Sequence, residues 1–260
     1  MTSPLMIAVA PNGARKTRLD HPALPIEPEE MAETAQACLE AGACMIHTHV
    51  RDNLGGHSLD VDRYRAATAA IRKRVGQDMI VQATTEAVGI YGVKEQMHMV
   101  RQLKPEGADE SRASSFFAWL SRERIMSQYI LYSAADISRF DDLRRRGIIP
   151  GDQVSVLYVL GRYSKNGQSS PAELLPMLKT ARTGVIWSVC AFGASEAACN
   201  LVAAGLGGHC RVGFENNLHL INGETAPDNQ ALIKQISNNA TLMARTQASP
   251  FEARSLLSQE

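Results

Sequence analysis

The chain has 260 residues, of which 45% are hydrophobic and 21% are charged. This composition supports a large buried core and excludes an intrinsically disordered chain. Twenty-seven lysines and arginines balance twenty-seven aspartates and glutamates, so neither nucleic acid nor an anionic membrane surface is expected as a partner.

Short apolar segments alternate with longer amphipathic ones along the chain. Seven short segments, rich in Val, Ile, Tyr or other apolar residues, predict strands. They are Leu5–Ala10, Cys44–Val50, Met79–Thr84, Tyr129–Ser133, Val154–Leu160, Val185–Cys190 and Cys210–Glu215. Between and after them, longer segments predict helices, several of which start with proline or acidic residues or end at glycine. They are Pro28–Ala41, Asp60–Arg74, Lys94–Leu103, Ser114–Arg124, Ala135–Arg146, Pro171–Thr180, Ser195–Ala204 and Asp228–Thr246.

Strands that alternate with helices predict an α/β fold with a parallel sheet. A (β/α)8 barrel, or TIM barrel, takes about 250 residues as one domain, so we expect a single barrel domain over residues 1–260. An open doubly wound sheet is the alternative, but it should carry a glycine-rich phosphate turn after its first strand, and Pro11-Asn12-Gly13-Ala14 is not that turn.

The fourth strand of the barrel is missing from this pattern. The segment Glu106–Ser115, where it should lie, is polar and has no apolar run. Either the strand is poorly encoded, or a segment that relatives possess is absent from this chain.

The cysteines are scattered and form no C-x-x-C pair, which argues against a disulfide framework or a zinc knuckle. They are Cys38, Cys44, Cys190, Cys199 and Cys210. We expect them to be buried thiols in a reducing compartment. The amino-terminal segment lacks the basic region of a signal peptide, and no apolar stretch approaches the roughly 20 residues of a membrane span. These features predict a cytoplasmic protein with no membrane partner.

Two histidines separated by one residue lie at the end of the second predicted strand. The side chains of His47 and His49 project to the same face of that strand. Val50-Arg51-Asp52 then leads to the carboxyl-terminal rim, where the active sites of barrels lie. Two imidazoles at this spacing suit Zn²⁺, with Fe²⁺, Mn²⁺ and Co²⁺ as further candidates. A pair of core histidines bonded to backbone carbonyls is the structural alternative.

A third metal ligand is predicted on the last strand. Arg211, Gly213 and Glu215 share one face of this strand, with Glu215 at the rim end. Barrel closure brings the last strand beside the first and within reach of the second. Two histidines and one carboxylate leave open positions for a substrate, which is typical of a catalytic site. Arg211, one layer deeper, could orient or activate a polar neighbour, or could pair structurally with a barrel carboxylate.

Other residues near the rim are candidates for substrate binding. Thr84 and Thr85 end the third strand, where their hydroxyls could bind a carboxylate, although β-branched residues also simply suit a strand. Asn12 and Arg15 follow the first strand and could face the mouth of the barrel, and Arg162 follows the sixth strand.

The remaining histidines are expected not to bind metal, with His21 in the first rim loop left open. His209, at the start of the last strand, should lie at the opposite end of the barrel. His57, His98 and His219 fall in predicted loops or helices.

The ordered motifs resemble those of the beta-keto acid cleavage enzyme family, typified by 3-keto-5-aminohexanoate cleavage enzyme. They are A-P-N-G (10–13), P-E-E-M-A (28–32), E-A-G-A (40–43), I-H-T-H-V-R-D (46–52), V-Q-A-T-T (81–85), V-L-Y-V-L-G (156–161), W-S-V-C-A-F-G (187–193) and G-G-H-C-R-V-G-F-E-N-N (207–217). The fourth and the last are the most specific. The resemblance covers nearly the whole chain except Glu106–Ser115.

This resemblance implies a zinc-bearing barrel, usually a homotetramer. Enzymes of this family are expected to condense a beta-keto acid with acetyl-CoA and to release acetoacetate and a new acyl-CoA through a retro-Claisen step. His47, His49 and Glu215 fall on the family's metal ligands, Arg211 on the arginine of its base dyad and Thr84 on a hydroxyl residue that contacts substrate. A divalent metal on the keto oxygen would lower the cost of forming the enolate.

Three positions depart from the family pattern. The aspartate of the base dyad matches Asn216, and a neutral amide cannot act as a carboxylate base, so another group or metal-bound water would take the proton. A glutamate that faces the substrate's ammonium group matches Arg15, and an acid near the end of the fifth strand matches Tyr132. The positive charge of Arg15 predicts a substrate whose distal group is neutral or anionic.

Two other functions stay open on the sequence. A metal-dependent hydrolase of the amidohydrolase type also has a barrel with H-x-H, but on its first strand and with further histidines and an aspartate on later strands. The second is a homologue that binds metal and has little cleavage activity, which Asn216 would explain.

Overall fold

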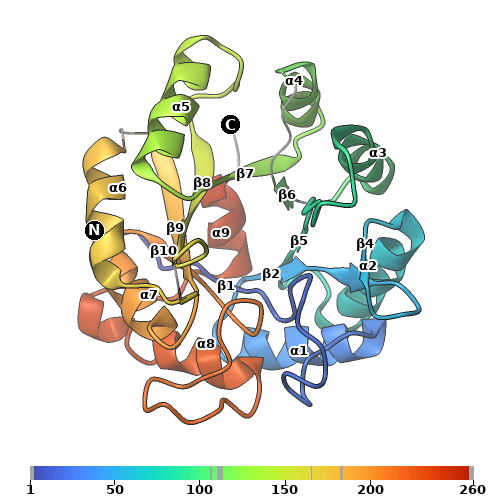
Figure 1. Cartoon of the computed structure of the whole chain (residues 1–260), viewed down its shortest axis with the longest axis vertical. Helices are drawn as coiled ribbons and strands as arrows, with labels where there is room; N and C mark the ends of the chain where they lie inside the picture. Colours follow the sequence, from blue (N-terminus) through green and yellow to red (C-terminus); the bar gives the residue numbers. More distant parts are fainter. Residues whose placement is uncertain (1–2, 106, 110–113, 165, 182–183, 258–260) are drawn as a thin grey trace.

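The computed structural model describes residues 3–105, 107–109, 114–164, 166–181 and 184–257. Its main sheet is parallel, and its strands follow the order β1, β10, β9, β8, β7, β6, β5, β2. Because β2 also pairs with β1, the order closes on itself (Figure 1). The predicted α/β fold with a parallel sheet curled into a barrel is confirmed.

The strands of this sheet are β1 (Ile7–Val9), β2 (Met45–Thr48), β5 (Ile80–Ala83), β6 (Gly107–Asp109), β7 (Met126–Leu131), β8 (Val154–Leu160), β9 (Val185–Ala191) and β10 (His209–Val212). The helices outside it are α1 (Pro28–Glu40), α2 (Val61–Val75), α3 (Val93–Leu103), α4 (Ser114–Arg122), α5 (Ala134–Arg145), α6 (Leu174–Thr180), α7 (Glu196–Gly205) and α8 (Asn229–Ser237) (Figure 1). A hairpin of β3 (Val50–Arg51) and β4 (His57–Ser58), the 3₁₀ turns η1 (Pro171–Glu173) and η2 (Thr241–Met243), and α9 (Pro250–Leu257) complete the described elements.

The fourth strand of the ring is β6. It pairs in parallel with β5 on one side and β7 on the other. Its sequence, Gly-Ala-Asp, carries almost no strand signal, so the strand is present but poorly encoded. Glu106 and residues 110–113 of the segment lie outside the described residues.

Several predicted elements were too long, among them the last strand and the last helix. The last strand ends at Val212 instead of Glu215, because Gly213 has a φ of 145° and turns the chain out of the sheet. The helix predicted over Asp228–Thr246 ends at Ser237, before two asparagines, which favour helix ends over helix interiors. Helix α9, which the sequence analysis did not predict, follows separately.

Helix α9 covers the end of the ring where the strands begin. Its residues Ala253 and Leu257 pack with Met6, Met45 and Ile80, which precede or begin strands of the barrel. Larger apolar clusters fill the layer between the strands and the outer helices. The open site must therefore lie at the carboxyl ends of the strands. None of the helices in the described ranges is long and apolar enough to cross a membrane.

His209 lies at the covered end, where the strands begin, as predicted. Its Nδ1 accepts a hydrogen bond of 3.0 Å from the backbone N–H of Met6. Nη2 of Arg245 lies 3.4 Å from the same nitrogen. Burial, and then the charge of Arg245, lower the pKa of His209 to about 3.

We predict that His209→Asn makes stability less sensitive to acid. The folded pKa of about 3 lies below the ordinary value of 6.5, so the unfolded chain binds more protons between these values. The stabilising contribution is complete above about pH 6.5 and is lost as the pH falls toward 3. Urea unfolding at pH 7 and pH 5 should show that the wild type loses about 2 kcal/mol more than the variant. Equal losses would contradict this assignment.

Candidate metal centre and its cavity

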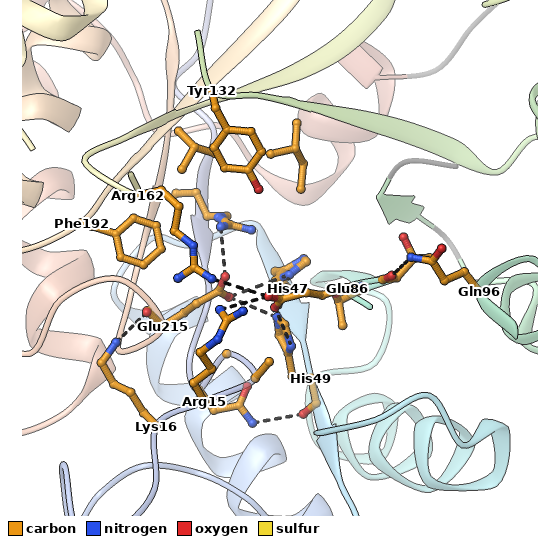
Figure 2. Close-up of a pocket in the computed structure, with 18 residues that line it drawn as sticks. Arg15, Lys16, His47, His49, Glu86, Gln96, Tyr132, Arg162, Phe192 and Glu215 are labelled. Atoms are coloured by element: carbon orange, nitrogen blue, oxygen red, sulfur yellow. Dashed lines mark hydrogen bonds and ion pairs between the residues drawn. The ribbon is translucent and has the colours of Figure 1, made fainter. Parts of the chain in front are cut away.

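The side chains of His47, His49 and Glu215 meet at the carboxyl ends of the strands (Figure 2). Nε2 of His47 lies 3.1 Å from Nε2 of His49. Oε2 of Glu215 lies 3.3 Å from Nε2 of His49 and 3.9 Å from Nε2 of His47. The structure thus brings together the three residues that the sequence selected as metal ligands.

These distances suit a divalent cation. Bonds of about 2.0–2.1 Å in a tetrahedral arrangement place two ligand atoms about 3.3–3.4 Å apart. Burial lowers the pKa of His49 to about 4, so its imidazole is neutral at pH 7. Neutral imidazole nitrogens and a carboxylate oxygen this close to one another repel unless a proton or a cation lies between them. The donor set therefore fits a metal ion such as Zn²⁺.

Gln82 orients the ring of His47. Nδ1 of His47 donates a hydrogen bond of 2.8 Å to Oε1 of Gln82, which leaves the lone pair of Nε2 for a metal. Gln82 stands opposite His47 in the register of β2 and β5. The sequence analysis did not select Gln82; a polar residue within an otherwise apolar strand was its only signal.

Arg211 lies beside Glu215. Its Nη2 is 3.2 Å from Oε1 of Glu215 and donates to Sγ of Cys190 at 3.4 Å. Burial alone would raise the pKa of Glu215, but Arg211 and His49 hold it well below its usual range. Glu215 is therefore a carboxylate at neutral pH, as a metal ligand must be.

Two glycines allow Glu215 to reach the site. A Cβ on Gly213 would lie 2.3 Å from the carbonyl oxygen of Ala10, and a Cβ on Gly13 would lie 2.6 Å from Cγ of Glu215. Both glycines have positive φ, 145° and 63°, which other residues adopt only with strain. The N–H of Glu215 donates to the carbonyl of Ala10 at 3.0 Å, which ties the turn after β10 to the end of β1.

Arg51 holds the loop that follows β1. Its guanidinium donates to the carbonyl oxygens of Ala14, at 2.7 Å, of Lys16, at 3.0 Å, and of Gly13. Arg51 is buried, so each of these bonds forms away from water. The arginine of the I-H-T-H-V-R-D motif thus positions the loop that carries Arg15 and Lys16.

A cavity of about 410 Å³ opens onto this centre. The residues from the sequence analysis that line it are Asn12, Arg15, His47, His49, Thr84, Thr85, Tyr132, Arg162, Arg211 and Glu215. Lining residues that the sequence analysis missed include Lys16, Glu86, Gln96, Ile130, Val159 and Phe192. The candidate site residues therefore lie at the rim of the barrel, as predicted, and Asn216 is the exception.

Two of the predicted polar residues make structural contacts at the cavity wall. Asn12 is fully buried, and its Nδ2 donates to the carbonyl oxygens of Pro25 and His49, at 3.0 and 3.1 Å. Oγ1 of Thr84 accepts from the N–H of Glu86 at 3.0 Å.

A charged cluster lies along the cavity wall. Nη1 of Arg15 is 3.2 Å and Nη2 of Arg162 is 3.8 Å from Oε1 of Glu86, whose Oε2 lies 3.9 Å from Nδ1 of His49. Nζ of Lys16 donates to the carbonyl oxygen of Glu215 at 2.6 Å, and burial lowers the pKa of Lys16. The wall carries more positive than negative side chains, which favours an anionic ligand.

The other wall of the cavity is largely apolar. Ile130, Val159 and Phe192 line it, and the guanidinium of Arg162 lies 5.0 Å from the ring centre of Phe192. The hydroxyl of Tyr132 points toward the centre of the cavity (Figure 2). A short carbon chain with an acidic end would therefore fit this space.

Asn216 does not join the site. It is buried, and neither atom of its side-chain amide makes a hydrogen bond with the part of the chain that the structure describes. It is also not among the described residues that line the cavity. In the described lining, Glu86 is the carboxylate outside the three candidate ligands.

His21 and His209 form hydrogen bonds with backbone groups away from the candidate metal centre. Nε2 of His21 lies 2.8 Å from the carbonyl oxygen of Ala226, and its Nδ1 accepts from the N–H of Ala23 at 3.1 Å. His57 lies nearer the site, with Nε2 2.8 Å from the carbonyl oxygen of Glu86. Among the described residues, the group that could hold a metal remains His47, His49 and Glu215.

The fold and the site define a parallel α/β barrel with two histidines and one carboxylate gathered at its open rim. The sequence model of the beta-keto acid cleavage enzyme family matches residues 4–117 and 108–258 of this chain. The chain belongs to this family.

Two curated relatives match almost end to end. The 3-keto-5-aminohexanoate cleavage enzyme of Fusobacterium nucleatum is 29% identical over 279 residues, covering 99% of this chain and 99% of that protein. The 3-oxoadipate:acetyl-CoA acetyltransferase of Cupriavidus necator is also 29% identical over 279 residues, covering 99% of this chain and 95% of that protein. Both alignments are longer than this chain, so the relatives have residues without a counterpart here. The two ranges of the family match overlap at residues 108–117, a segment that begins within β6.

Among solved structures, apo ObcA is similar in fold, with a TM-score of 0.75 and 17% identity. The match covers 91% of this chain and 65% of the ObcA chain, so this chain spans less than two thirds of the length of ObcA. At this identity the similarity concerns the fold alone.

We predict that Gly213→Ala destabilises the protein by at least about 2 kcal/mol. Alanine at a φ of 145° is strained, and its Cβ would collide with the backbone oxygen of Ala10. Urea unfolding measures the loss. Gly205→Ala, in helix α7, is the matched control, because its nearest new contact is an ordinary 3.8 Å to Sδ of Met243. A Gly213→Ala protein as stable as the control would contradict the role of this turn.

Proposed function

We propose that this chain is a single-domain (β/α)8-barrel enzyme that cleaves a beta-keto acid with acetyl-CoA. Two carbons of the acid leave with the acetyl group as acetoacetate, and the remaining acyl part leaves on CoA. The observation that carries the proposal is the convergence of His47, His49 and Glu215 on an open cavity in a chain of this family. Relatives named for cleavage of a beta-keto acid and for acetyl transfer from acetyl-CoA support it.

The proposed metal is Zn²⁺, with another divalent ion as the alternative. When bound by His47, His49 and Glu215, it would polarise the keto oxygen and stabilise negative charge that develops there. Gln82 holds the His47 ring in the tautomer that suits this role, and Arg211 keeps Glu215 ionised. Lys16, at the carbonyl of Glu215, adds positive charge beside the same cavity.

The proposed substrate has no distal ammonium group. Arg15 and Arg162 share one carboxylate, Glu86, at the cavity wall, so this wall repels a cation and attracts an anion. Tyr132 supplies a neutral hydroxyl where the family resemblance places an acid. A relative named for 3-oxoadipate, a keto acid with a second carboxylate, is consistent with an anionic distal group.

We further propose that the protein acts in the cytoplasm as a homotetramer. All five cysteines are buried and unpaired, which suits a reducing compartment. The tetramer rests on the resemblance to the family.

We predict that His47→Ala abolishes both metal binding and catalysis. Loss of one of three protein ligands removes most of the affinity for a divalent ion. Elemental analysis of the purified wild type should find about one metal per chain, and the variant should contain little. In a screen of beta-keto acids with acetyl-CoA, the wild type should release acetoacetate and His47→Ala should not.

The outcomes separate the competing functions. If the wild type contains no stoichiometric metal, both the proposed metalloenzyme and the alternative metal-dependent hydrolase are contradicted. A wild type that binds metal but releases no acetoacetate with any acid would instead support a metal-binding homologue with little activity, which the neutral amide of Asn216 favours.

We predict that 3-oxoadipate outcompetes 3-keto-5-aminohexanoate as a substrate. Arg15→Glu should shift the ratio of the kcat/KM values of these two substrates about tenfold in favour of 3-keto-5-aminohexanoate. The reason is that it reverses one half-exposed charge at the cavity wall. Arg65→Glu, on the outer helix α2, is the control. Competition assays on both variants and the wild type measure the ratio. Preference of the wild type for 3-keto-5-aminohexanoate would refute the assignment of the distal group.

A further inference from the structure

A buried carboxyl group bridges both ends of the turn that carries Glu215. Glu196, the first residue of α7, is 1% exposed. Its Oε1 accepts from the N–H of Gly213 at 3.1 Å, and its Oε2 accepts from Nδ2 of Asn217 at 3.2 Å. Gly213 and Asn217 flank the Phe214-Glu215-Asn216 segment, so one side chain holds this segment from both sides.

The amide of Asn217 is fixed in the orientation that requires an acceptor. Its Nδ2 also donates to the carbonyl of His219 at 2.6 Å, and its Oδ1 accepts from the N–H of His219 at 3.0 Å. Turning the amide over would break both bonds. Glu196 must therefore offer two acceptor oxygens, one to Asn217 and one to Gly213, and a carboxylate is the side chain that does so.

The other hydrogen bonds of the turn hold a different part of it from the part that Glu196 holds. The N–H of Phe214 donates to Oδ1 of Asn229 at 2.9 Å, and the N–H of Glu215 donates to the carbonyl of Ala10 at 3.0 Å. These bonds fix the middle of the turn, and Glu196 fixes its two ends. Because Glu215 projects from this middle, a shift of either end moves its carboxylate away from the two imidazoles.

The surroundings of Glu196 make the burial of its carboxyl group energetically unfavourable. Burial raises the pKa of Glu196 to about 8, and the charges of Lys16 and Arg211, which face it from the loop after β1 and from β10, act in the opposite direction. A buried acid is expensive unless its oxygens are hydrogen-bonded. Here both oxygens have partners, and both partners belong to the turn.

We propose that Glu196 is a positioning residue of the metal centre, which holds the Gly213–Asn217 turn so that Glu215 meets His47 and His49. It is not among the described residues that line the cavity and acts only through the turn. The proposal rests on the proposed metal site and is independent of which reaction the cavity supports.

Glu196→Gln and Glu196→Ala test the proposal. Glutamine keeps an oxygen for Gly213 but directs an NH₂ group at the NH₂ group of Asn217, and alanine removes both acceptors. Chelator-treated protein is titrated with Co²⁺ and with Zn²⁺. We expect the dissociation constant to rise about tenfold in Glu196→Gln and up to about 100-fold in Glu196→Ala. Glu252→Gln is the matched control, because Glu252 also accepts a backbone N–H, from Ser249 at 2.8 Å, in the first turn of α9 at the covered end.

Hydrogen exchange on the metal-free proteins gives a second, metal-independent readout. Peptides that span residues 209–219 should exchange faster in both variants than in the wild type, and peptides from α9 should not. Thermal unfolding identifies a variant that fails to fold, and Glu196→Gln, which keeps the volume and one hydrogen bond, then carries the test.

The outcomes distinguish this inference from the proposed reaction. Unchanged metal affinity in Glu196→Gln, with unchanged exchange in the turn, would overturn the inference. A wild type that binds no metal would overturn it as well. A wild type that binds metal with Glu196-dependent affinity but cleaves no beta-keto acid would sustain the inference while the proposed reaction fails.

Discussion

The closure of the sheet between β1 and β10 is the constraint on which the site depends. The N–H of Ala10 donates to the carbonyl of Val212 at 2.8 Å, and the carbonyl of Ala10 accepts from Glu215 at 3.0 Å. One residue at the end of β1 therefore holds both the last strand and the turn beyond it. Because β2 pairs with the other edge of β1, this closure places a carboxylate from the end of the chain against two histidines from near its beginning.

Electrostatics then assigns a charge state to each group in the centre. Burial lowers the pKa of His49 and keeps this imidazole neutral, while Arg211 keeps Glu215 ionised. The same surroundings would penalise a second unpaired charge, so the remaining acid of the described cavity wall, Glu86, lies between Arg15 and Arg162. The centre and the wall are thus different environments: one suits a divalent cation and the other an anion.

The sequence predicted that His47, His49 and Glu215 meet because their signal is local or falls in a specific motif. The two-residue period of a strand places His47 and His49 on one face, and this holds without any tertiary information. The expected position of Glu215 was only partly right: it was expected on the strand face, yet the strand ends at Val212 and Glu215 reaches the site from a turn. The strained φ of Gly213, which makes this turn, has no sequence signal beyond the glycine itself.

The missed residues are those whose roles depend on neighbours distant in the chain. Gln82 matters because of its register opposite His47, and Arg51 because three carbonyls of another loop surround its guanidinium. Strand β6 escaped detection for a similar reason, since Gly-Ala-Asp is a strand only because β5 and β7 pair with it on both sides. Hydrophobic periodicity cannot report such contacts.

Asn216 gives the turn a neutral side chain at the position where the family resemblance places an aspartate. An aspartate there would add a second buried carboxyl group next to Glu215 in the chain, and burial disfavours its ionised form. With this neutral amide at position 216, the carboxyl group that contacts the turn is Glu196, which is hydrogen-bonded to both of its ends. Glu196 is not among the described residues that line the cavity. It can therefore stabilise the Gly213–Asn217 turn but cannot take a proton from the carbon of a substrate. Glu86, the carboxylate of the described cavity wall outside the candidate metal ligands, contacts Arg15 and Arg162 instead, so the turn and the cavity wall carry their carboxyl groups on different elements of the barrel.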